Sequence, residues 1–182
     1  DELNMSPPKY LMSLGGGLHG EQTGKMLIEI EQVLVKEKPD YVLVYGDTNS
    51  TLAGALAAAK LHIPIIHVEA GLRSFNKKMP EEINRVLTDN LSSILLCPTE
   101  LAIANLKNEN IVDEVYKTGD IMCDMIAIAE KAQLIKKSAN HIQYIYTTIH
   151  RPYNTDDLER LKEVLYHLNS LPQKVIMARH PR

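Results

Sequence analysis

The chain has 182 residues, of which 45% are apolar and 24% charged, a composition typical of a folded globular protein. Its formal net charge of −3 at pH 7 gives no electrostatic reason to expect a nucleic acid or an anionic membrane as partner. No apolar run reaches the roughly 18 residues that a membrane-spanning helix needs, and residues 1–4 lack the basic region of a secretion signal, so we expect a cytoplasmic protein.

Strand and helix patterns alternate along the first three quarters of the chain. Short runs rich in β-branched residues indicate buried strands, and apolar residues at helical spacing indicate helices between them. This alternation predicts an α/β fold in which residues 1–135 form a Rossmann-like parallel sheet with helices on both faces. The predicted order is helix 21–36, strand 41–45, helix 50–61, strand 64–68, helix 80–91, strand 93–97, helix 99–108, strand 114–118 and helix 121–134.

A second unit follows the polar, aperiodic stretch 136–141, which is typical of a domain boundary. It consists of strand 144–149, helix 156–169 and strand 174–178. Two parallel strands cannot bury both faces of a sheet, so we interpret residues 142–182 as the start of a second Rossmann-like domain. Because the chain begins without Met and ends directly after a predicted strand, we expect both ends to be cut.

The two cysteines, Cys97 and Cys123, are far apart in the sequence, and each follows apolar residues. We therefore expect two reduced thiols in the core. The sequence contains no His-Glu-x-x-His motif and no paired metal-ligand spacing, so we expect no metal site.

Acidic side chains lie where the predicted strands end and the next helix begins. Asp47 and Glu69 each follow a predicted strand, and Glu81 and Glu82 open the helix after the second of these strands. Ligands of open parallel sheets bind outside the carboxyl ends of the strands, so we expect these carboxylates to meet in one crevice.

Cationic side chains accompany these carboxylates. His150 and Arg151 follow the first strand of the second unit, and Arg73 lies four residues after Glu69. Carboxylates combined with cations suit proton transfer on a ligand that carries phosphates. Glu69 ends a buried strand without an evident solvated face, so it is either paired, for example with Arg73, or takes part in the chemistry. We expect His67 to hold Glu69 in place without contacting the ligand itself.

The other carboxylates have ordinary structural alternatives. Asp47 or Ser50 can cap the helix that follows, which is worth roughly 1 kcal/mol. Glu81 and Glu82 are also typical of a helix start, where carboxylates meet the positive end of the helix dipole. Arg85, one turn further along, can form a surface ion pair with either of them.

Seven segments in this order resemble the non-hydrolysing UDP-N-acetylglucosamine 2-epimerases, and the resemblance covers nearly the whole chain. It implies a two-domain glycosyltransferase B-type fold and interconversion of UDP-N-acetylglucosamine with UDP-N-acetylmannosamine. In that reaction a proton leaves carbon 2 while UDP is expelled, and UDP adds back after protonation on the other face. The segments are His19–Met26, Gly46–Ser50, His67–Ser74, Pro80–Arg85, Pro98–Glu100, Thr118–Asp120 and His150–Pro152.

The resemblance also assigns roles by motif match. It implies a substrate, UDP-N-acetylglucosamine, a homodimer for the complete protein, and no metal or redox cofactor. It makes His150 a contact of the UDP part. The catalytic carboxylates that it implies are Asp47, Glu69 and Glu81, and the further substrate-binding candidates are Arg151, Arg73 and Glu82.

The chain departs from the family pattern in two ways. It lacks the first strand with its basic loop and most of the second domain, and Tyr153 stands where the family often has Glu. Two alternatives stay open beside the main reading. One is a hydrolysing epimerase that releases free N-acetylmannosamine, and the other is an inactive remnant that at most binds a nucleotide or a partner.

Overall fold

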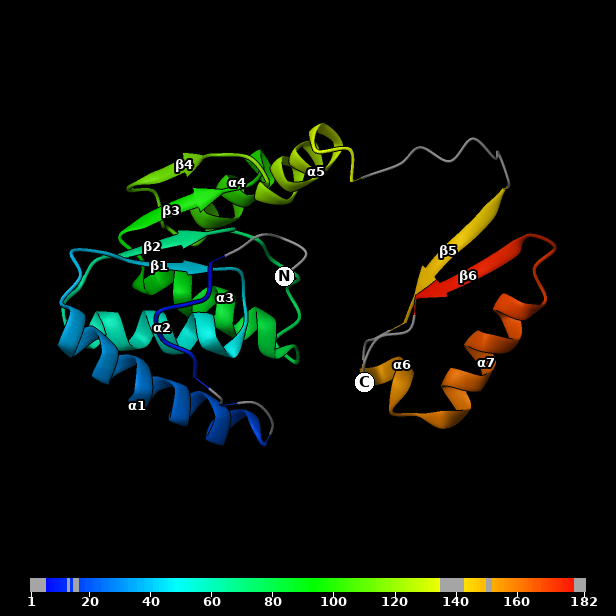
Figure 1. Cartoon of the computed structure of the whole chain (residues 1–182), viewed down its shortest axis with the longest axis horizontal. Helices are drawn as coiled ribbons and strands as arrows, with labels where there is room; N and C mark the ends of the chain where they lie inside the picture. Colours follow the sequence, from blue (N-terminus) through cyan, green and yellow to red (C-terminus); the bar gives the residue numbers. More distant parts are fainter. Residues whose placement is uncertain (1–5, 13, 15–16, 135–142, 150–151, 179–182) are drawn as a thin grey trace. The chain divides into compact units, whose positions relative to one another are not determined.

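The structure, a computed structural model, describes residues 6–12, 14, 17–134, 143–149 and 152–178 (Figure 1). It divides the chain into two compact units, Asp1–Ala129 and Glu130–Arg182. The predicted domain limits, 1–135 and 142–182, stay a prediction. The elements are α1 (His19–Glu37), β1 (Val42–Tyr45), α2 (Asn49–Lys60), β2 (Ile65–Val68), α3 (Pro80–Leu91), β3 (Ile94–Cys97), α4 (Glu100–Asn108), β4 (Val115–Lys117), α5 (Ile121–Lys131), β5 (Tyr144–Thr148), α6 (Pro152–Thr155), α7 (Leu158–Asn169) and β6 (Lys174–Ala178).

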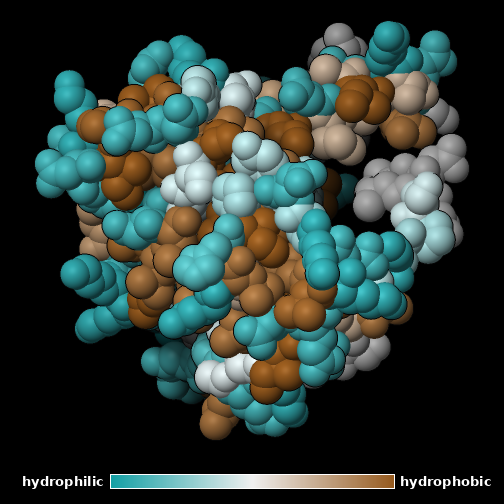
Figure 2. All heavy atoms as spheres, turned by 90° about the vertical axis from the view of Figure 1, so that its left-hand side faces the viewer, coloured by the Kyte–Doolittle hydropathy of each residue, from teal (hydrophilic) through white to brown (hydrophobic). Residues whose placement is uncertain are grey.

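The first unit contains a parallel sheet in the order β1-β2-β3-β4. Its strands bear out the predicted α/β fold. Val44 meets α2, His67 meets α3, and Leu95 packs with Ala102 of α4; since these three strand residues are register partners, the three helices cover one face. The opposite face presents half-exposed apolar side chains, among them Leu43, Tyr45 and Tyr116. Apolar side chains also stand between hydrophilic ones on the surface that Figure 2 shows.

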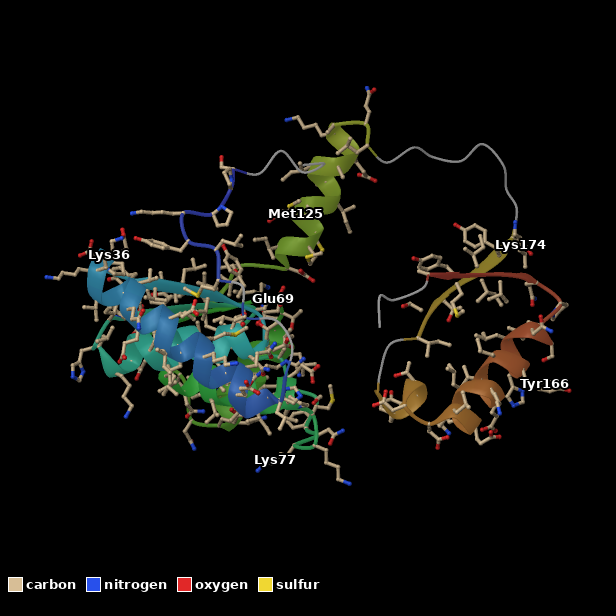
Figure 3. All side chains as sticks on the ribbon, turned by 60° about the horizontal axis from the view of Figure 1, so that its bottom comes forward. Lys36, Glu69, Lys77, Met125, Tyr166 and Lys174 are labelled. Atoms are coloured by element: carbon tan, nitrogen blue, oxygen red, sulfur yellow. The ribbon has the colours of Figure 1, made fainter. Side chains whose placement is uncertain are left out.

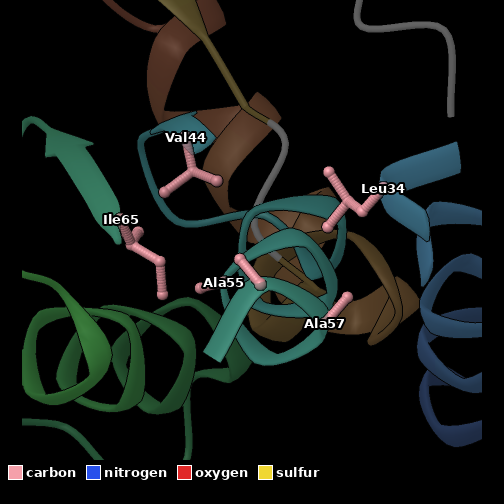
Figure 4. Packing of buried hydrophobic residues seen from close by; sticks show 6 residues of the cluster. Leu34, Val44, Ala55, Ala57 and Ile65 are labelled. Atoms are coloured by element: carbon pink, nitrogen blue, oxygen red, sulfur yellow. The ribbon is translucent and has the colours of Figure 1, made fainter. Parts of the chain in front are cut away.

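Two apolar clusters form the core of the first unit. Helix α2 approaches the sheet closely because its inner side chains are small: a Cβ added to Gly54 would lie 3.3 Å from Val44 Cγ1. The first cluster joins α1, α2, β1 and β2 through Leu34, Val44, Ala55, Ala57, Ala58 and Ile65 (Figure 4). The second joins the loop after β2, β3 and α4 through Ala70, Leu95, Cys97, Ala102 and Leu106.

Helix α3 is turned so that its polar side faces inward. Glu82 and Asp89 are buried, whereas Ile83 and Leu87 on the other side are 47% and 46% exposed. A soluble amphipathic helix ordinarily has the reverse orientation. The polar residues of α3 therefore build the interior of the site, whereas Ile83 and Leu87 lie on the surface.

The predicted core position of the cysteines is confirmed for Cys97 and wrong for Cys123. Both are free thiols, but only Cys97 is buried, and Cys123 lies exposed on α5. Helix α5 has no buried residue, and Met125 on the same helix is also exposed (Figure 3). The apolar residues around Cys123 therefore do not pack into a core formed by the described residues.

The second unit is a single β-α-β arrangement, as predicted. Strands β5 and β6 pair in parallel from Tyr144 opposite Lys174 to Thr148 opposite Ala178. The one-turn helix α6 stands where a loop was predicted, because four residues are too few to show a helical period. Across the described ranges, no helix combines the length and the apolar character that crossing a lipid bilayer requires.

Candidate active site

The turn after β1 carries Asp47 and is held by hydrogen bonds to β2 and α3. The Gly46 N–H donates to the Val68 carbonyl at 3.0 Å, and Gly46 has the left-handed φ of 62° that this turn requires. The Asn84 side chain donates to the Asp47 carbonyl at 2.8 Å. Arg85 Nη2 donates to Asp47 Oδ2 at 2.6 Å, so the carboxylate is held beside a cation.

Helix α2 is capped by Thr48, whose side chain accepts from the Thr51 N–H while the Thr48 N–H donates to Thr51 Oγ1. The expected alternative, a cap at Asp47 or Ser50, is therefore wrong. Since a neighbouring hydroxyl satisfies the end of the helix, the Asp47 carboxylate is left to pair with Arg85.

Glu69 lies directly after β2 with an unusual backbone. Its φ is 70°, a left-handed conformation that costs an L-residue roughly 1 to 2 kcal/mol. Its side chain is half-buried and makes no hydrogen bond or ion pair to any described residue. A Cβ added to Gly46 would meet Glu69 Oε2 at 3.4 Å, so this carboxylate abuts the turn that carries Asp47. The pairing with Arg73 considered above is not present.

Arg73 is buried and fully engaged by protein groups. Its Nη1 donates to Asp89 Oδ2 at 2.7 Å and to the Leu72 carbonyl, and its Nε and Nη2 donate to the Glu109 carboxylate at 2.7 Å. Burial disfavours the charge, but the bonds to Glu109 and Asp89 outweigh it and raise the pKa of Arg73. Arg73 thus ties the loop after β2 to α3 and to the end of α4.

Glu82 is also buried, and its oxygens accept four hydrogen bonds. Ser74 N–H and Oγ and Arg85 Nη1 donate to Oε2 at 2.8 to 2.9 Å, and the Phe75 N–H donates to Oε1 at 2.8 Å. Burial acts against the charged form, but these donors outweigh it and hold the pKa of Glu82 below its usual value. Glu82 therefore fixes the 74–75 loop and Arg85.

His67 lies at zero exposure between two of these segments. Its Nδ1 is 2.6 Å from Asp89 Oδ1, and its Nε2 is 2.8 Å from the Gly46 carbonyl oxygen. The second oxygen of Asp89 accepts from the Gly71 N–H at 3.1 Å. His67 thus supports the site through Gly46 and Asp89 and makes no hydrogen bond to Glu69.

Asparagines connect the amino ends of three helices behind the carboxylates. Asn84 Nδ2 donates to Asn49 Oδ1 at 3.2 Å, and Asn49 Nδ2 donates to Gln22 Oε1 at 2.7 Å and lies 3.1 Å from His19 Nδ1. Glu81 follows Pro80 in the first turn of α3 and is half-buried. The starts of α1, α2 and α3 therefore meet at one edge of the sheet.

Sequence analysis did not find Asp89, Asn84, Asn49 or Glu109. For Asp89 the signal was the spacing of Glu82, Arg85 and Asp89, which places them on one face of a helix. Asn49 and Asn84 lie within the segments Gly46–Ser50 and Pro80–Arg85 but were not singled out. His150 and Arg151 lie outside the described residues, so their roles stay predictions. Among the described residues, no group of three or more His, Cys, Asp or Glu side chains is arranged to hold a metal ion.

The arrangement provides two carboxylates in different surroundings. Asp47 is paired with Arg85, whereas Glu69 is half-buried and has no partner among the described residues. A carboxylate without a partner is free to take a proton from a bound molecule, whereas a paired one keeps its hydrogen bonds to the cation. The site suits acid and base catalysis at the carboxyl edge of the sheet.

Comparison with known proteins identifies the family of the chain. The sequence model of the UDP-N-acetylglucosamine 2-epimerase family matches residues 1–182. The chain is 52% identical to a UDP-N-acetylglucosamine 2-epimerase homolog of Methanococcus maripaludis, covering 100% of this chain and 53% of the relative. It is 51% identical to a UDP-2,3-diacetamido-2,3-dideoxy-D-glucuronate 2-epimerase of Pseudomonas aeruginosa, again covering 100% of this chain and 53% of the relative.

A solved structure gives the same result for the fold. The crystal structure of Methanocaldococcus jannaschii UDP-GlcNAc 2-epimerase, in complex with UDP-GlcNAc and UDP, superposes with a TM-score of 0.90 at 46% identity, covering 100% of this chain and 53% of that one. The chain spans about half the length of the curated relatives it matches. The chain belongs to the UDP-N-acetylglucosamine 2-epimerase family.

Proposed function

We propose that the whole protein interconverts UDP-N-acetylglucosamine and UDP-N-acetylmannosamine. The observation that carries the proposal is the unpaired, half-buried Glu69 beside the ion-paired Asp47. Family membership supports it, as does the relative whose structure is a complex with UDP-GlcNAc and UDP.

The proposed reaction proceeds by elimination and addition. A carboxylate takes the proton from carbon 2, the electron pair of that C–H bond forms a double bond to carbon 1, and the C1–O bond breaks to release UDP. Protonation of carbon 2 on the other face and return of UDP to carbon 1 give the epimer. Proton transfer by positioned carboxylates of this kind is worth about 10² to 10⁴ in rate.

The candidate residues take different roles in this proposal. Asp47, Glu69 and Glu81 are the proton-transfer carboxylates, and His150 and Arg151 are the contacts of UDP. For Arg73 and Glu82, first expected to bind substrate, we propose a supporting role instead. Protein groups already occupy their polar atoms, and both hold the loop after β2 in place.

A second substrate deserves a direct comparison because of the 51% identical relative from Pseudomonas aeruginosa. The sugar in the name of that relative carries an acetamido group at carbon 3 and a carboxylate at carbon 6. The chemistry at carbon 2 is the same for both sugars, so the described carboxylates suit either. Specificity therefore depends on contacts with carbons 3 and 6.

The test is proton NMR of the full-length protein in D₂O with each UDP-sugar supplied separately. Deuterium at carbon 2 together with the UDP-linked manno epimer is the expected result for UDP-N-acetylglucosamine. Free N-acetylmannosamine would indicate the hydrolysing reaction, and preferential turnover of the diacetamido-glucuronate would assign the second substrate. No exchange with either sugar would contradict the proposal.

Two matched variants locate the chemistry. Glu69→Gln removes the unpaired carboxylate and is expected to lower the exchange rate at least 10²-fold. Glu31→Gln makes the same change at an exposed position of α1, and activity should stay at the wild-type level. Equal activity of both variants would show that Glu69 is not a proton-transfer group.

We also propose that the whole protein is a homodimer that pairs through the outer side of α3. Ile83, Val86 and Leu87 line an apolar groove there, together with the exposed Phe75 of the preceding loop. Analytical ultracentrifugation of the wild type and of Leu87→Glu tests this, and the variant is expected to be monomeric. A monomeric wild type would contradict it.

The cytoplasmic location expected from the sequence stays part of the proposed function, and cell fractionation tests it.

A further inference from the structure

His67 faces a hydrogen-bond acceptor on each side of its ring. Nδ1 lies 2.6 Å from a carboxylate oxygen of Asp89, and Nε2 lies 2.8 Å from the carbonyl oxygen of Gly46. Neither oxygen can donate a hydrogen bond unless Asp89 is protonated. The other oxygen of Asp89 accepts from the Arg73 guanidinium and from the Gly71 N–H, which are the surroundings of a carboxylate anion. Each nitrogen of the ring must therefore donate.

A ring that donates from both nitrogens is an imidazolium. The state rests on the two acceptors that face the ring. Arg73 shares its charge between the buried Asp89 and Glu109, whose side chain is 32% exposed. The His67 and Asp89 side chains are 0% exposed, so water offers no substitute partner.

Three further neighbours of His67 and Asp89 carry no charge. Burial, and after it the nearby Asp89 charge, raise the pKa of the Cys97 thiol on β3 to about 11, so the thiol stays neutral. Leu95 is the register partner of His67 on β3 and is apolar. Val44, its partner on β1, is also apolar.

The two hydrogen bonds of His67 lead to the two turns that carry the candidate carboxylates. Through Nε2, the ring holds the Gly46 carbonyl, one residue before Asp47. Through Asp89, it holds the Gly71 N–H, two residues after Glu69. We propose that His67 is a buried imidazolium and the positioning residue that sets the distance between Asp47 and Glu69. This inference rests on the proposed function of the same site.

The first test measures the charge on the 182-residue chain with ¹⁵N-labelled histidine. A two-bond ¹H–¹⁵N spectrum at pH 7 is expected to show both ring nitrogens of His67 protonated, with slowly exchanging N–H protons. The signals are assigned by their loss in His67→Gln. A His67 nitrogen at the position of an unprotonated imidazole would overturn the proposal.

Two further variants provide controls for this measurement. His62→Asn removes an exposed histidine at a left-handed position that Asn tolerates, and it should leave the His67 signals unchanged. Asp89→Asn removes the counter-charge, and the His67 ring is expected to lose one of its protons. If the ring stays doubly protonated in Asp89→Asn, the pairing of His67 with Asp89 does not hold the charge, and the proposal fails.

The second test measures the positioning in the full-length protein. His67→Gln is expected to lower kcat for carbon-2 exchange by roughly 10²-fold, because displaced catalytic groups lose about that much. KM should change less than about twofold, because His67 does not contact the substrate. Unchanged kcat, or a loss that lies entirely in KM, would contradict the positioning role. Absence of exchange in the wild type would instead refute the proposed function, and the NMR result would still decide the charge of His67.

Discussion

Glu82→Gln is the most informative single change in the described structure. The substitution keeps the size and shape of the side chain but replaces one carboxylate oxygen with an NH₂ group. In the wild type, both oxygens accept from donors: Ser74 N–H and Oγ, the Phe75 N–H, and Arg85 Nη1. Whichever way the amide is turned, its NH₂ group faces at least one N–H that cannot accept a hydrogen bond.

The expected loss of stability follows from these contacts. Hydrogen bonds to a charged group contribute about 1.5 to 3 kcal/mol each, and a buried donor left without a partner costs a similar amount. Since the Glu82 side chain is only 4% exposed, water cannot restore the lost bonds. Losing one oxygen and the charge therefore predicts a decrease of about 3 to 5 kcal/mol in the free energy of unfolding.

The same contacts predict a pH dependence with a definite sign. The pKa of Glu82 in the folded chain lies below its ordinary value of 4.5. Its contribution to stability is thus fully present above pH 4.5 and disappears as the pH falls through the lower, folded value. The wild type should lose stability in this acidic range, and Glu82→Gln should lose less, because the group that titrates is gone.

Urea unfolding followed by circular dichroism, at pH 7 and across the acidic range, measures both effects. Glu31→Gln, with the same chemical change at an exposed position, should stay within about 0.5 kcal/mol of the wild type. If Glu82→Gln is as stable as this control, or if its acid dependence equals that of the wild type, the four hydrogen bonds do not hold the 74–75 loop as described.

Two further predictions concern the second core cluster. Gly71→Ala should destabilise the chain by about 2 to 5 kcal/mol in urea unfolding, because its φ is 78° and the new Cβ would lie 2.4 Å from the Ala102 carbonyl oxygen; Gly24→Ala, with open space around it, should cost nothing, and equal stabilities would refute the close approach. Burial, followed by the Asp89 charge, raises the pKa of Cys97 to about 11, so at pH 8 a thiol reagent should modify the exposed Cys123 quickly and Cys97 only after unfolding; two fast thiols in the folded chain would contradict this.

The order of elements could be predicted because it depends on local patterns. The run Ile65–Val68 and the apolar spacing in α1 identify their elements without knowledge of any other part of the chain. The glycine and proline residues beside them mark the ends. The predicted strand and helix limits therefore agree with the structure to within one or two residues in most cases.

The interior of the site could not be predicted in the same way. Asp89 has the sequence context of an ordinary surface residue, and only the packing of α3 against β2 brings it to His67. Helix α3 also departs from the rule that an amphipathic helix turns its apolar side to the core, because its Ile83 and Leu87 face outward. Thr48 caps α2 because of the backbone geometry of the turn. In sequence alone, Asp47, Thr48 and Ser50 are all residue types that cap helices.

The alanine-rich inner side of α2 has a consequence for how the first unit acquires its order. Ala and Gly have no side-chain rotamers to lose, so fitting this helix against β1 and β2 costs almost no side-chain conformational entropy. The larger side chains of the same cluster, Leu34, Val44 and Ile65, come from α1, β1 and β2. The turn that carries Asp47 is joined directly to this helix, so it gains a rigid support at a small entropic cost.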